Sequence, residues 1–173
     1  MSVKLHYQYS TPSTQMTARV HLKHMRAGVL YKFVASEQSN GQGTKGKSWQ
    51  SPVGGFYTSY AWLGHHWLNP AFSVDLASGI SRFLNDCGIP SVVKIPNDII
   101  VDHKKLAGIL IEQEKINNHV AVIVGLGMNV MVKIESDQPT CSLSEYTNMA
   151  LEDVEFMIDK VIWTAASQVG ALI

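Results

Sequence analysis

One short polar segment combines glycines with lysines and is the first place in the chain where the residue types could do chemistry. The stretch from Gly41 to Ser48 contains three glycines together with Lys45 and Lys47. Glycines let a backbone approach a ligand closely and expose its N–H groups, while lysines supply positive charge. This composition is typical of an anion-binding loop, but a glycine-rich surface loop without a ligand would have it too, so the segment alone leaves both interpretations open.

The same segment satisfies the phosphate-loop expression G-x-x-x-x-G-K-[ST]. A phosphate loop works because it runs directly into a helix, whose first N–H groups complete the phosphate cradle. Here Pro52, Gly54 and Gly55 follow shortly after the loop, and these residue types disfavour a helix. Asp102 is a weak match to the acidic residue that such proteins use for Mg²⁺. We therefore reject the phosphate-loop interpretation.

Three later segments add chemistry to the loop, namely Lys94-Ile-Pro-Asn-Asp98, Lys105-Leu-Ala-Gly-Ile-Leu110 and Gly125-Leu-Gly-Met-Asn129. Each is weak alone, because Pro-Asn-Asp is a turn sequence and Gly-x-Gly is common. Together with Gly41–Trp49, and in this order, they resemble the biotin–protein ligase family. The family pattern reads Gly-Arg-Gly-Arg-x-Gly-Arg-x-Trp, Lys-Trp-Pro-Asn-Asp, Lys-Leu-x-Gly-Ile-Leu and Gly-x-Gly-x-Asn, and the resemblance covers roughly residues 13–130.

The resemblance implies an α+β fold with a mixed, largely antiparallel sheet and packed helices, as in biotin ligases, lipoate ligases and class II aminoacyl-tRNA synthetases. It also implies a reaction in two steps with ATP and Mg²⁺. The carboxylate of biotin attacks the α-phosphate of ATP to give biotinyl-adenylate and pyrophosphate. A lysine amine of a partner, typically the biotin carboxyl carrier domain of a carboxylase such as acetyl-CoA carboxylase, then attacks the adenylate.

Two residues match the family's catalytic positions. Lys105 matches a lysine that sits at the biotin carboxylate and the α-phosphate, where a cation between two anions lowers the barrier. Its neighbour Lys104 should point away from the site, because side chains alternate along a strand. Asp98 matches an aspartate near the adenylate and the incoming amine, which is protonated in water near pH 7 and must lose its proton to react. Without the resemblance, Lys105 would be a surface lysine and Asp98 a turn residue.

Further residues match ligand contacts. Ser13, Thr14 and Gln38 match contacts to the ureido ring of biotin, whose carbonyl and two N–H groups a hydroxyl and an amide could satisfy. Trp49 should form an apolar wall that keeps water from the adenylate. The implied biotin contacts are Ser13, Thr14, Gln15, Gln38, Gly41, Gln42, Gly43, Lys105 and Gly108. The implied ATP contacts are Thr44, Lys47, Trp49, Asn97 and Asn129. We expect no metal site in the protein beyond Mg²⁺ carried by the ATP phosphates.

The loop departs from the family pattern. Gln42 and Thr44 stand where the family has arginines, Lys47 replaces a third arginine, and Ile95 replaces the tryptophan before Pro-Asn-Asp. Arginine grips phosphate with a planar fork, whereas lysine is a point charge and threonine is neutral. Because a lost charge-assisted hydrogen bond costs about 1.5–3 kcal/mol, we expect weaker retention of the adenylate.

The elements that must position these residues can be read from the hydrophobic pattern. Strands are predicted at Val29–Glu37, Phe56–Trp62, Val92–Ile95, Ile99–Val101, Leu106–Gln113 and His119–Val130. A first helix should begin at a cap on Ser13 or Thr14 and run toward Gly28. A second should be capped by Asn69, have Pro70 in its first position and end at Gly88, with Cys87 on its buried face. A last helix should bury Leu151, Val154, Ile158, Val161 and Ala165.

Composition limits the remaining alternatives. The 173 residues suit one domain, and we expect residues 1–173 to be a single ligase-type catalytic domain without an N-terminal helix-turn-helix or a C-terminal β-barrel. Fourteen basic and fourteen acidic residues cancel, which does not favour binding to DNA or membranes. Two cysteines make no disulfide framework, and a cytoplasmic location follows. His65 and His66 lack a third metal ligand. A homodimer formed through the sheet, as in some members of the family, stays open.

Two other functions stay open. A lipoate or octanoate ligase would share the fold and the catalytic lysine, although the Lys-x-Pro-Asn-Asp segment and the loop spacing favour the biotin branch. A degenerate domain that binds biotin or a carrier without catalysis would explain Gln42 and Thr44, but Lys105 and Asp98 argue against it.

Overall fold

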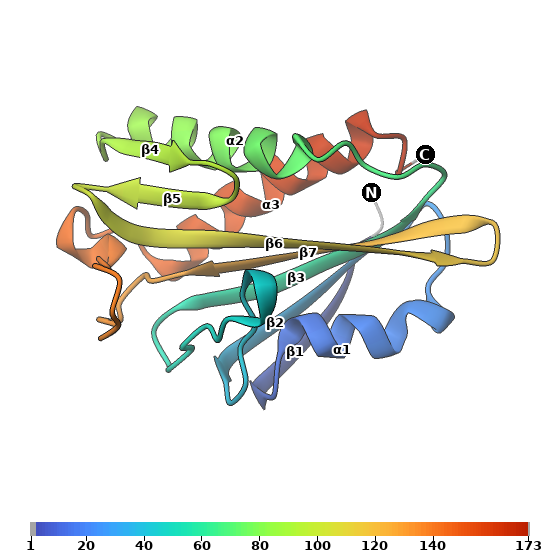
Figure 1. Cartoon of the computed structure of the whole chain (residues 1–173), viewed down its shortest axis with the longest axis horizontal. Coiled ribbons are helices and arrows are strands. Elements are labelled where there is room, and N and C mark those ends of the chain that lie inside the picture. The colour runs from blue at the N-terminus through green and yellow to red at the C-terminus, as the bar shows by residue number, and fades with distance from the viewer. Residues whose placement is uncertain (1–2, 173) are drawn as a thin grey trace.

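The computed structural model describes residues 3–172, and a seven-stranded sheet runs through it (Figure 1). Its strand order is β1-β2-β3-β7-β6-β5-β4. Strands β1 and β2 are parallel, and every other neighbouring pair is antiparallel. The strands are β1 (Val3–Thr11), β2 (Leu30–Gln38), β3 (Phe56–Gly64), β4 (Ser91–Lys94), β5 (Asp98–Val101), β6 (Lys104–Ile116) and β7 (His119–Met128). The expected mixed, largely antiparallel α+β architecture is confirmed.

Helices cover both faces of this sheet. Figure 1 shows α2 and α3 on one face and α1 on the other. The α-helices are α1 (Thr14–His21), α2 (Phe72–Asp86) and α3 (Leu151–Gln168), and three short 3₁₀ turns are η1 (Leu22–His24), η2 (Thr44–Gly46) and η3 (Leu143–Glu145). Because β3 lies in the middle of the sheet with helices on both sides, it is buried along its whole length.

Side-chain alternation divides the interior into two cores. Alternate residues of a strand point to opposite faces. On β3, Tyr60 and Trp62 therefore join the large core beneath α2 and α3, whereas Ala61 and Leu63 join the smaller core beneath α1. On β7 the second set continues with Ala121 and Ile123. The functional cavities described below open on the α1 face, beyond the end of the smaller core.

Strand β1 was not predicted. Its sequence does alternate apolar and polar residues, with Val3, Leu5, Tyr7 and Tyr9 at the apolar positions, and this is the pattern of a strand, so the strand could have been predicted. It lies at the edge of the sheet, and most of its residues are exposed on both faces. Leu5, Tyr7 and Tyr9 are exposed apolar side chains on it. Its parallel pairing with β2 is what makes the sheet mixed, and it brings Thr11 beside Gln38 at the site.

The first helix begins where predicted and ends earlier. Helix α1 starts at Thr14 and stops at His21, with one 3₁₀ turn before the chain reaches Gly28. Ser13 occupies the N-cap position, but its side chain makes no capping hydrogen bond. The side-chain cap was therefore a wrong prediction, and the hydroxyl of Ser13 is left for another partner.

Helix α2 is shifted from its predicted ends. It begins at Phe72, two residues after Pro70, although the side chain of Asn69 does accept a hydrogen bond from the backbone N–H of Ala71. The placement of Cys87 in the core was wrong. The helix ends at Asp86, and Cys87 lies exposed in a non-helical C-cap conformation, because the chain turns there and Ile89 fills the core position instead.

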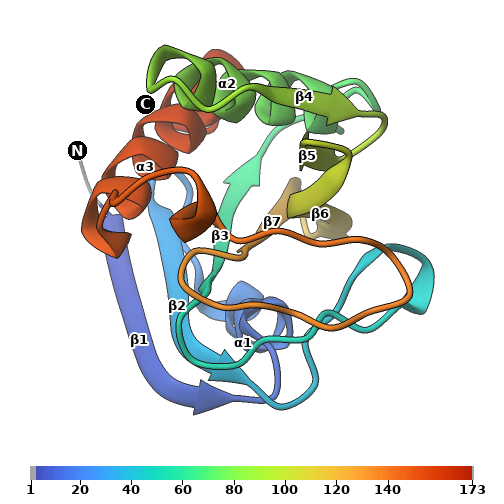
Figure 2. The same ribbon diagram turned by 90° about the vertical axis from the view of Figure 1, so that its left-hand side faces the viewer.

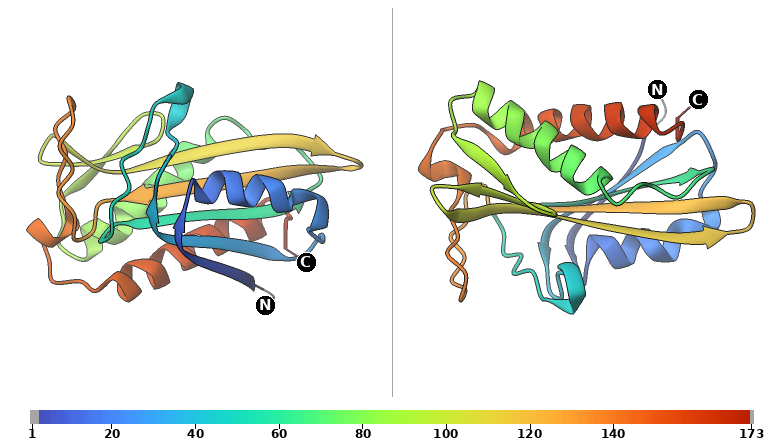
Figure 3. Two further views of the ribbon diagram at one scale, coloured as in Figure 1. Left: turned by 90° about the horizontal axis from the view of Figure 1, so that it is seen from below. Right: turned by 45° about the horizontal axis from the view of Figure 1, so that its top comes forward.

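The observed strands and the last helix differ in detail from the predicted ones. Strands β6 and β7 form a long hairpin that projects beyond the short strands β4 and β5 (Figure 3). Helix α3 buries Val154 and Ile158 as expected, but Met157, Ile162 and Ala166 complete its buried stripe. The other residues predicted on this face are only partly buried, namely Leu151, Val161 and Ala165. The stripe is rotated because α3 packs against both α2 and β3.

No helix within residues 3–172 is long and apolar enough to cross a membrane.

Candidate active site

Glycines open a cavity on the α1 face of the sheet. The face of β7 that carries Ala121 and Ile123 continues with Gly125 and Gly127, and β6 contributes Gly108 opposite Gly127. A Cβ atom on Gly125 would lie 2.5 Å from the side-chain oxygen of Gln15, and one on Gly127 would lie 2.5 Å from the indole of Trp49. Real Cβ contacts are never so short, so only glycine allows these two side chains to lie on the sheet.

The glycine loop brings Trp49 over this opening. The backbone N–H of Trp49 donates to the carbonyl of Gly41, and the N–H of Gly43 donates to the carbonyl of Lys47. A Cβ on Gly41 would lie 2.3 Å from the carbonyl oxygen of Trp49, so the loop folds tightly on itself. The segment between the loop and β3 contains no helix, which confirms that the phosphate-loop context is missing.

The resulting cavity brings together eleven of the predicted site residues. Its predicted lining residues are Ser13, Thr14, Gln15, Gln38, Gln42, Gly43, Thr44, Trp49, Asn97, Lys105 and Gly108. Its open volume is about 50 Å³, far below the roughly 300–1,000 Å³ of a typical ligand pocket. Trp49 occupies much of the space over Gly108 and Gly127, so a ligand can enter that space only if Trp49 moves.

One end of this cavity is a polar floor. It consists of Thr14, Gln15, Gln38 and Ser59, all of which line the cavity. The hydroxyl oxygens of Thr14 and Ser59 are 2.9 Å apart, and Ser59 also donates to the amide oxygen of Gln15. The backbone N–H of Thr14 donates to the amide oxygen of Gln38 at 2.8 Å. A hydrogen-bonded group of this kind in a mostly apolar cavity fixes the orientation of a bound head group.

Ser13 adds an unused hydroxyl beside the floor. Its side chain is 1% exposed, and its oxygen has no hydrogen-bond partner among residues 3–172. A buried hydroxyl without a partner costs free energy. Ser13 is therefore prepared to bond a ligand that reaches the floor.

The two predicted catalytic side chains touch one another at the other end of the cavity. The amine of Lys105 forms an ion pair with Asp98, with 2.7 Å between Nζ and Oδ1. The same amine lies 5.2 Å from the ring centre of Trp49. Both side chains are largely buried, so the pair is screened less by water than a surface pair would be. Lys105 is the one charged side chain among the described residues that line this cavity.

Lys104 behaves as its position on the strand predicts. Its amine lies 3.9 Å from Glu145, away from the cavity. The two adjacent lysines therefore point in different directions, and the prediction that Lys104 points away from the site is confirmed.

A second, larger cavity of about 400 Å³ adjoins the first. Trp49, Thr44 and Lys105 line both cavities, and residues 134–138 close the far side of the second. Figure 2 shows the loop after β7 and the glycine loop at the same end of the sheet. Lys47 and Asn129, both predicted to contact ATP, line this second cavity. Of the other predicted ATP contacts, Thr44 and Trp49 line both cavities and Asn97 lines only the first, so the two predicted sets overlap in space.

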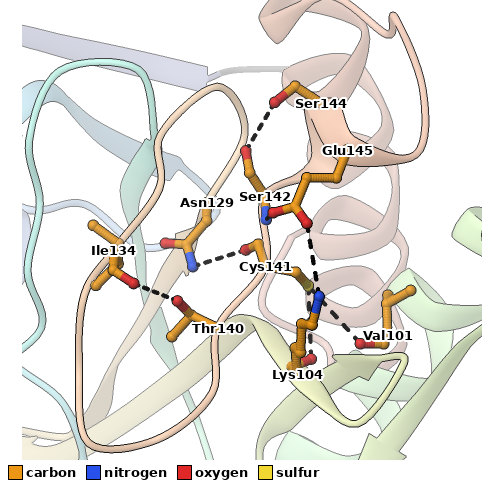
Figure 4. Close-up of polar contacts among 9 residues, drawn as sticks. All are labelled: Val101, Lys104, Asn129, Ile134, Thr140, Cys141, Ser142, Ser144 and Glu145. Carbon is orange, nitrogen blue, oxygen red and sulfur yellow. Dashed lines mark hydrogen bonds and ion pairs between the residues drawn. The ribbon is translucent and has the colours of Figure 1, made fainter.

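A clip closes the base of the loop after β7 (Figure 4). The side-chain N–H of Asn129 donates to the carbonyl of Cys141 at 3.1 Å. The hydroxyl of Ser142 donates to the carbonyl of Val130, which the figure does not draw. The backbone of Lys105 is held by the same segment, because its N–H donates to Pro139 and its carbonyl accepts from Cys141. The clip thus places Asn129 and Lys105 together.

The clip has a buried thiol and an unpaired oxygen. Burial raises the pKa of the Cys141 thiol, so the group stays protonated and lies within 4.0 Å of the carbonyls of Val101 and Lys104 (Figure 4). The amide oxygen of Asn129 is buried and has no partner among residues 3–172. A carbonyl-type oxygen is a ligand that Mg²⁺ accepts, and this one lines the larger cavity.

Two predicted residues lie outside the lining of both cavities. Asp98 reaches the site only through Lys105. Gly41 is buried at the start of the loop, where its lack of a side chain lets the carbonyl of Trp49 and the hydroxyl of Ser51 approach its backbone. The sequence interpretation also missed Ser59, Gly125 and Gly127 as lining residues. Ser59 could have been found, because Thr58 and Ser59 are two polar residues in an otherwise apolar strand segment.

Comparison with known proteins agrees with this geometry. The profile of the biotin/lipoate A/B protein ligase family matches residues 7–129. The chain is 36% identical to the bifunctional ligase/repressor BirA of Salmonella typhimurium over 110 residues, which are 60% of this chain and 34% of that protein. It is 32% identical to BirA of Bacillus spizizenii over 135 residues, which are 75% of this chain and 41% of that protein.

Solved structures share the fold. The biotin protein ligase of Aquifex aeolicus in complex with biotin and ATP superposes with a TM-score of 0.76 and 25% identity, covering 95% of this chain and 71% of that one. A bipartite lipoate protein ligase from Thermoplasma acidophilum superposes with a TM-score of 0.70 and 11% identity, covering 96% of this chain and 84% of that one.

These findings identify the class. The chain belongs to the biotin/lipoate A/B protein ligase family, and its fold is the one that biotin protein ligases share with class II aminoacyl-tRNA synthetases. It spans about a third of the length of the curated relatives that it matches first.

Proposed function

We propose that this domain is a biotin–protein ligase. It joins biotin to ATP as biotinyl-adenylate and then transfers the biotinyl group to a lysine amine of a biotin carboxyl carrier domain. The observation that carries the proposal is the pairing of a polar floor beside the free hydroxyl of Ser13 with a single lysine at the opposite end of the same cavity. Such a cavity suits an acid whose head group can both donate and accept hydrogen bonds.

The head group of biotin matches the floor. A ureido ring has one carbonyl acceptor and two N–H donors. The hydroxyl of Ser13 can donate to the carbonyl, and the amide oxygens of Gln15 and Gln38 can accept from N–H groups. A lipoyl dithiolane or an octanoyl chain offers no such partners and would leave Ser13 unsatisfied, at a cost that typically gives strong discrimination.

Lys105 would serve the adenylation step. An oxygen of the biotin carboxylate attacks the α-phosphorus of ATP, the bond to the bridging oxygen breaks, and pyrophosphate leaves. Lys105 would stabilise the two anions as they approach, because a positioned cation acts most strongly in a site that excludes water. The adjoining larger cavity would hold the nucleotide, and Mg²⁺ bound to the phosphates would neutralise charge on the leaving pyrophosphate. The unpaired oxygen of Asn129 fits an ion or its bound water there.

Asp98 would serve the transfer step. The incoming amine must lose a proton before it attacks the acyl carbon of the adenylate, with AMP as the leaving group. Asp98 is already paired with Lys105, so it would hold the lysine in place during the first step. Its carboxylate would then orient the incoming ammonium group and accept its proton during the second step.

The test is direct biotinylation. Purified protein is incubated with biotin, Mg-ATP and a carrier domain, and labelled carrier is detected by avidin blot. Parallel reactions with lipoate and octanoate, followed by the mass of the carrier because avidin binds neither acid, test the other branch of the family. Modification of the carrier with biotin, but not with lipoate or octanoate, supports the proposal. Transfer of lipoate or octanoate in preference to biotin would assign the domain to the lipoate branch, and no transfer by a folded protein would favour a non-catalytic binding domain.

A further inference from the structure

A charged pair lies directly behind the polar floor. Glu112 on β6 forms an ion pair with Arg19 of α1, and its other oxygen accepts a hydrogen bond of 2.9 Å from the amide nitrogen of Gln15. Glu112 itself does not appear among the described residues that line the first cavity. It contacts a lining residue, Gln15, which is 3% exposed.

We propose that Glu112, held by Arg19, is a positioning residue that sets the acid specificity of the site. It fixes the orientation of the Gln15 amide and so makes the floor selective for an acid whose head group carries N–H donors. This inference rests on the proposed function and adds two residues that the family resemblance does not assign.

The carboxylate determines which way the Gln15 amide points. An ionised carboxylate only accepts hydrogen bonds, and an amide group donates through nitrogen and accepts through oxygen. If the amide turned over, its oxygen would face the oxygen of Glu112 with no hydrogen between them. The nitrogen must therefore face Glu112, and the oxygen must face Ser59.

The orientation of the second amide of the floor, that of Gln38, is fixed in the same way. The oxygen of Gln38 accepts from the backbone N–H of Thr14, which cannot reverse its role. The nitrogen of Gln38 donates to the hydroxyl of Ser51 at 2.8 Å, and that hydroxyl donates to the carbonyl of Trp49. Both amides thus present their oxygen atoms to the row of hydroxyls between them.

This arrangement leaves the floor one hydrogen short. Four oxygens follow one another in a row, from Gln15 through Ser59 and Thr14 to Gln38, at separations of 2.9, 2.9 and 3.2 Å. The three contacts need three hydrogens, but the two hydroxyls supply only two. One pair of oxygens is therefore always in contact without a hydrogen, which is unfavourable in a buried place.

A ligand can supply the missing hydrogen. A head group with an N–H donor relieves the unfavourable contact when it reaches the row, whereas a hydrocarbon chain or a dithiolane does not. The selectivity depends on Glu112, because without it the Gln15 amide could turn over and donate to Ser59 itself. The floor would then be satisfied without a ligand, and an N–H donor would gain less.

The experiment compares three variants of the whole chain. Glu112→Ala removes the acceptor, Glu112→Gln removes the charge but keeps an amide oxygen that can accept from Gln15, and Glu114→Ala is the control. Glu114 is an exposed acidic residue on the same face of β6 and has no hydrogen bond to the floor. For each variant, calorimetry measures the Kd for biotin, and pyrophosphate release measures the KM for biotin and Mg-ATP and the rate with octanoate.

We expect Glu112→Ala to raise the Kd and KM for biotin roughly tenfold, the effect of about one lost hydrogen bond. The KM for Mg-ATP and the low rate with octanoate should stay unchanged, and Glu112→Gln should retain most of the affinity for biotin. Equal biotin affinity in Glu112→Ala and wild type would overturn the inference. So would a Glu112→Gln variant as weak as Glu112→Ala, because charge rather than the acceptor would then matter.

A measurement without ligand keeps this test separate from the proposed function. In the ligand-free wild type, the side-chain amide protons of Gln15 should resonate downfield in a ¹⁵N-labelled NMR spectrum, because one of them is donated to a carboxylate. Glu112→Ala should return them to the ordinary position while the backbone spectrum is preserved, and no change would overturn the inference alone. A wild type that binds no biotin would overturn the proposed function and the selectivity together.

Discussion

Replacing Gly127 with alanine places a methyl group where the indole of Trp49 lies. The added Cβ would be 2.5 Å from Nε1 and Cε2 of the ring and 2.9 Å from Cζ2. Carbon atoms in contact prefer about 3.5–4.0 Å, so the ring must move by about 1 Å. The backbone of β7 cannot yield instead, because it is bonded to β3 on one side and to β6 on the other.

The displacement should weaken activity more than stability. Trp49 lies on a loop and is partly exposed, so the cost to the free energy of unfolding should fall near the lower end of the roughly 1–3 kcal/mol typical of overpacking. The ring lines both cavities, and a misplacement of about 1 Å in a reacting site can cost about 100-fold in rate. We expect kcat/KM for pyrophosphate release to fall by about that factor.

Two further glycines provide graded controls in the same assay. A Cβ on Gly108 would lie 3.2 Å from the indole and 3.3 Å from Cε of Lys105, and both side chains can accommodate it by a few tenths of an ångström. A Cβ on Gly64 would lie 3.7 Å from its nearest neighbour, an ordinary contact. Activity should therefore decrease in the order Gly64→Ala, Gly108→Ala, Gly127→Ala, with thermal unfolding recorded for each variant.

A second substitution tests the cause. Trp49→Phe removes Nε1 and Cζ2, two of the atoms that the new methyl meets, so it should recover part of the activity that Gly127→Ala loses. If Gly108→Ala were as damaging as Gly127→Ala, or if Trp49→Phe only added to the damage, a steric clash with Trp49 would not be the explanation.

Three further predictions concern charge. Lys105→Met should lower the rate of adenylate formation by about 10²–10³-fold, as for loss of a positioned electrostatic group, while circular dichroism stays native; unchanged pyrophosphate release would contradict the role of the cation. Thr44→Arg should slow the release of biotinyl-adenylate, because a guanidinium would grip its phosphate; stopped-flow release no slower than in wild type would count against this reasoning. Burial, together with neighbouring His21 and Lys4, lowers the pKa of His6, which stacks on Phe33. Its contribution to stability should therefore be complete above the ordinary pKa of about 6.5 and decline as the pH falls through the lowered value. The urea midpoint of the wild type should therefore drop more than that of His6→Gln between pH 7.5 and 5. An equal drop in both proteins would refute the role of His6.

The sequence by itself determined the elements that carry strong local signals. The strand from Leu30 to Gln38, the hairpin around Pro96 and the amphipathic helix before Gly88 follow from residue pattern and turn chemistry, and all are present. The order of the four motifs indicated the family, which the profile match confirms. Because these signals act over a few residues, they can be read from the sequence without knowing the rest of the fold.

Where local sequence signals were not sufficient, tertiary contacts decided the structure. Strand β1 has the alternating pattern of a strand, but its apolar side chains stay exposed at the edge of the sheet, and the sequence does not show that it pairs parallel to β2. Cys87 continues the helical period in sequence, but the helix ends before it so that Ile89 can enter the core. The period of a helix cannot reveal the residue at which packing stops it.

The site shows the same division. Lys105 and Ser13 could be named from motifs, but not that a cavity would join them. Glu112 lies 97 residues from Gln15 in the chain, and no local pattern connects them. Their contact exists because β6 and α1 meet on one face of the sheet. The identities of the reacting residues are local information, whereas the direction in which each hydrogen bond points is set by partners that only the folded chain brings together.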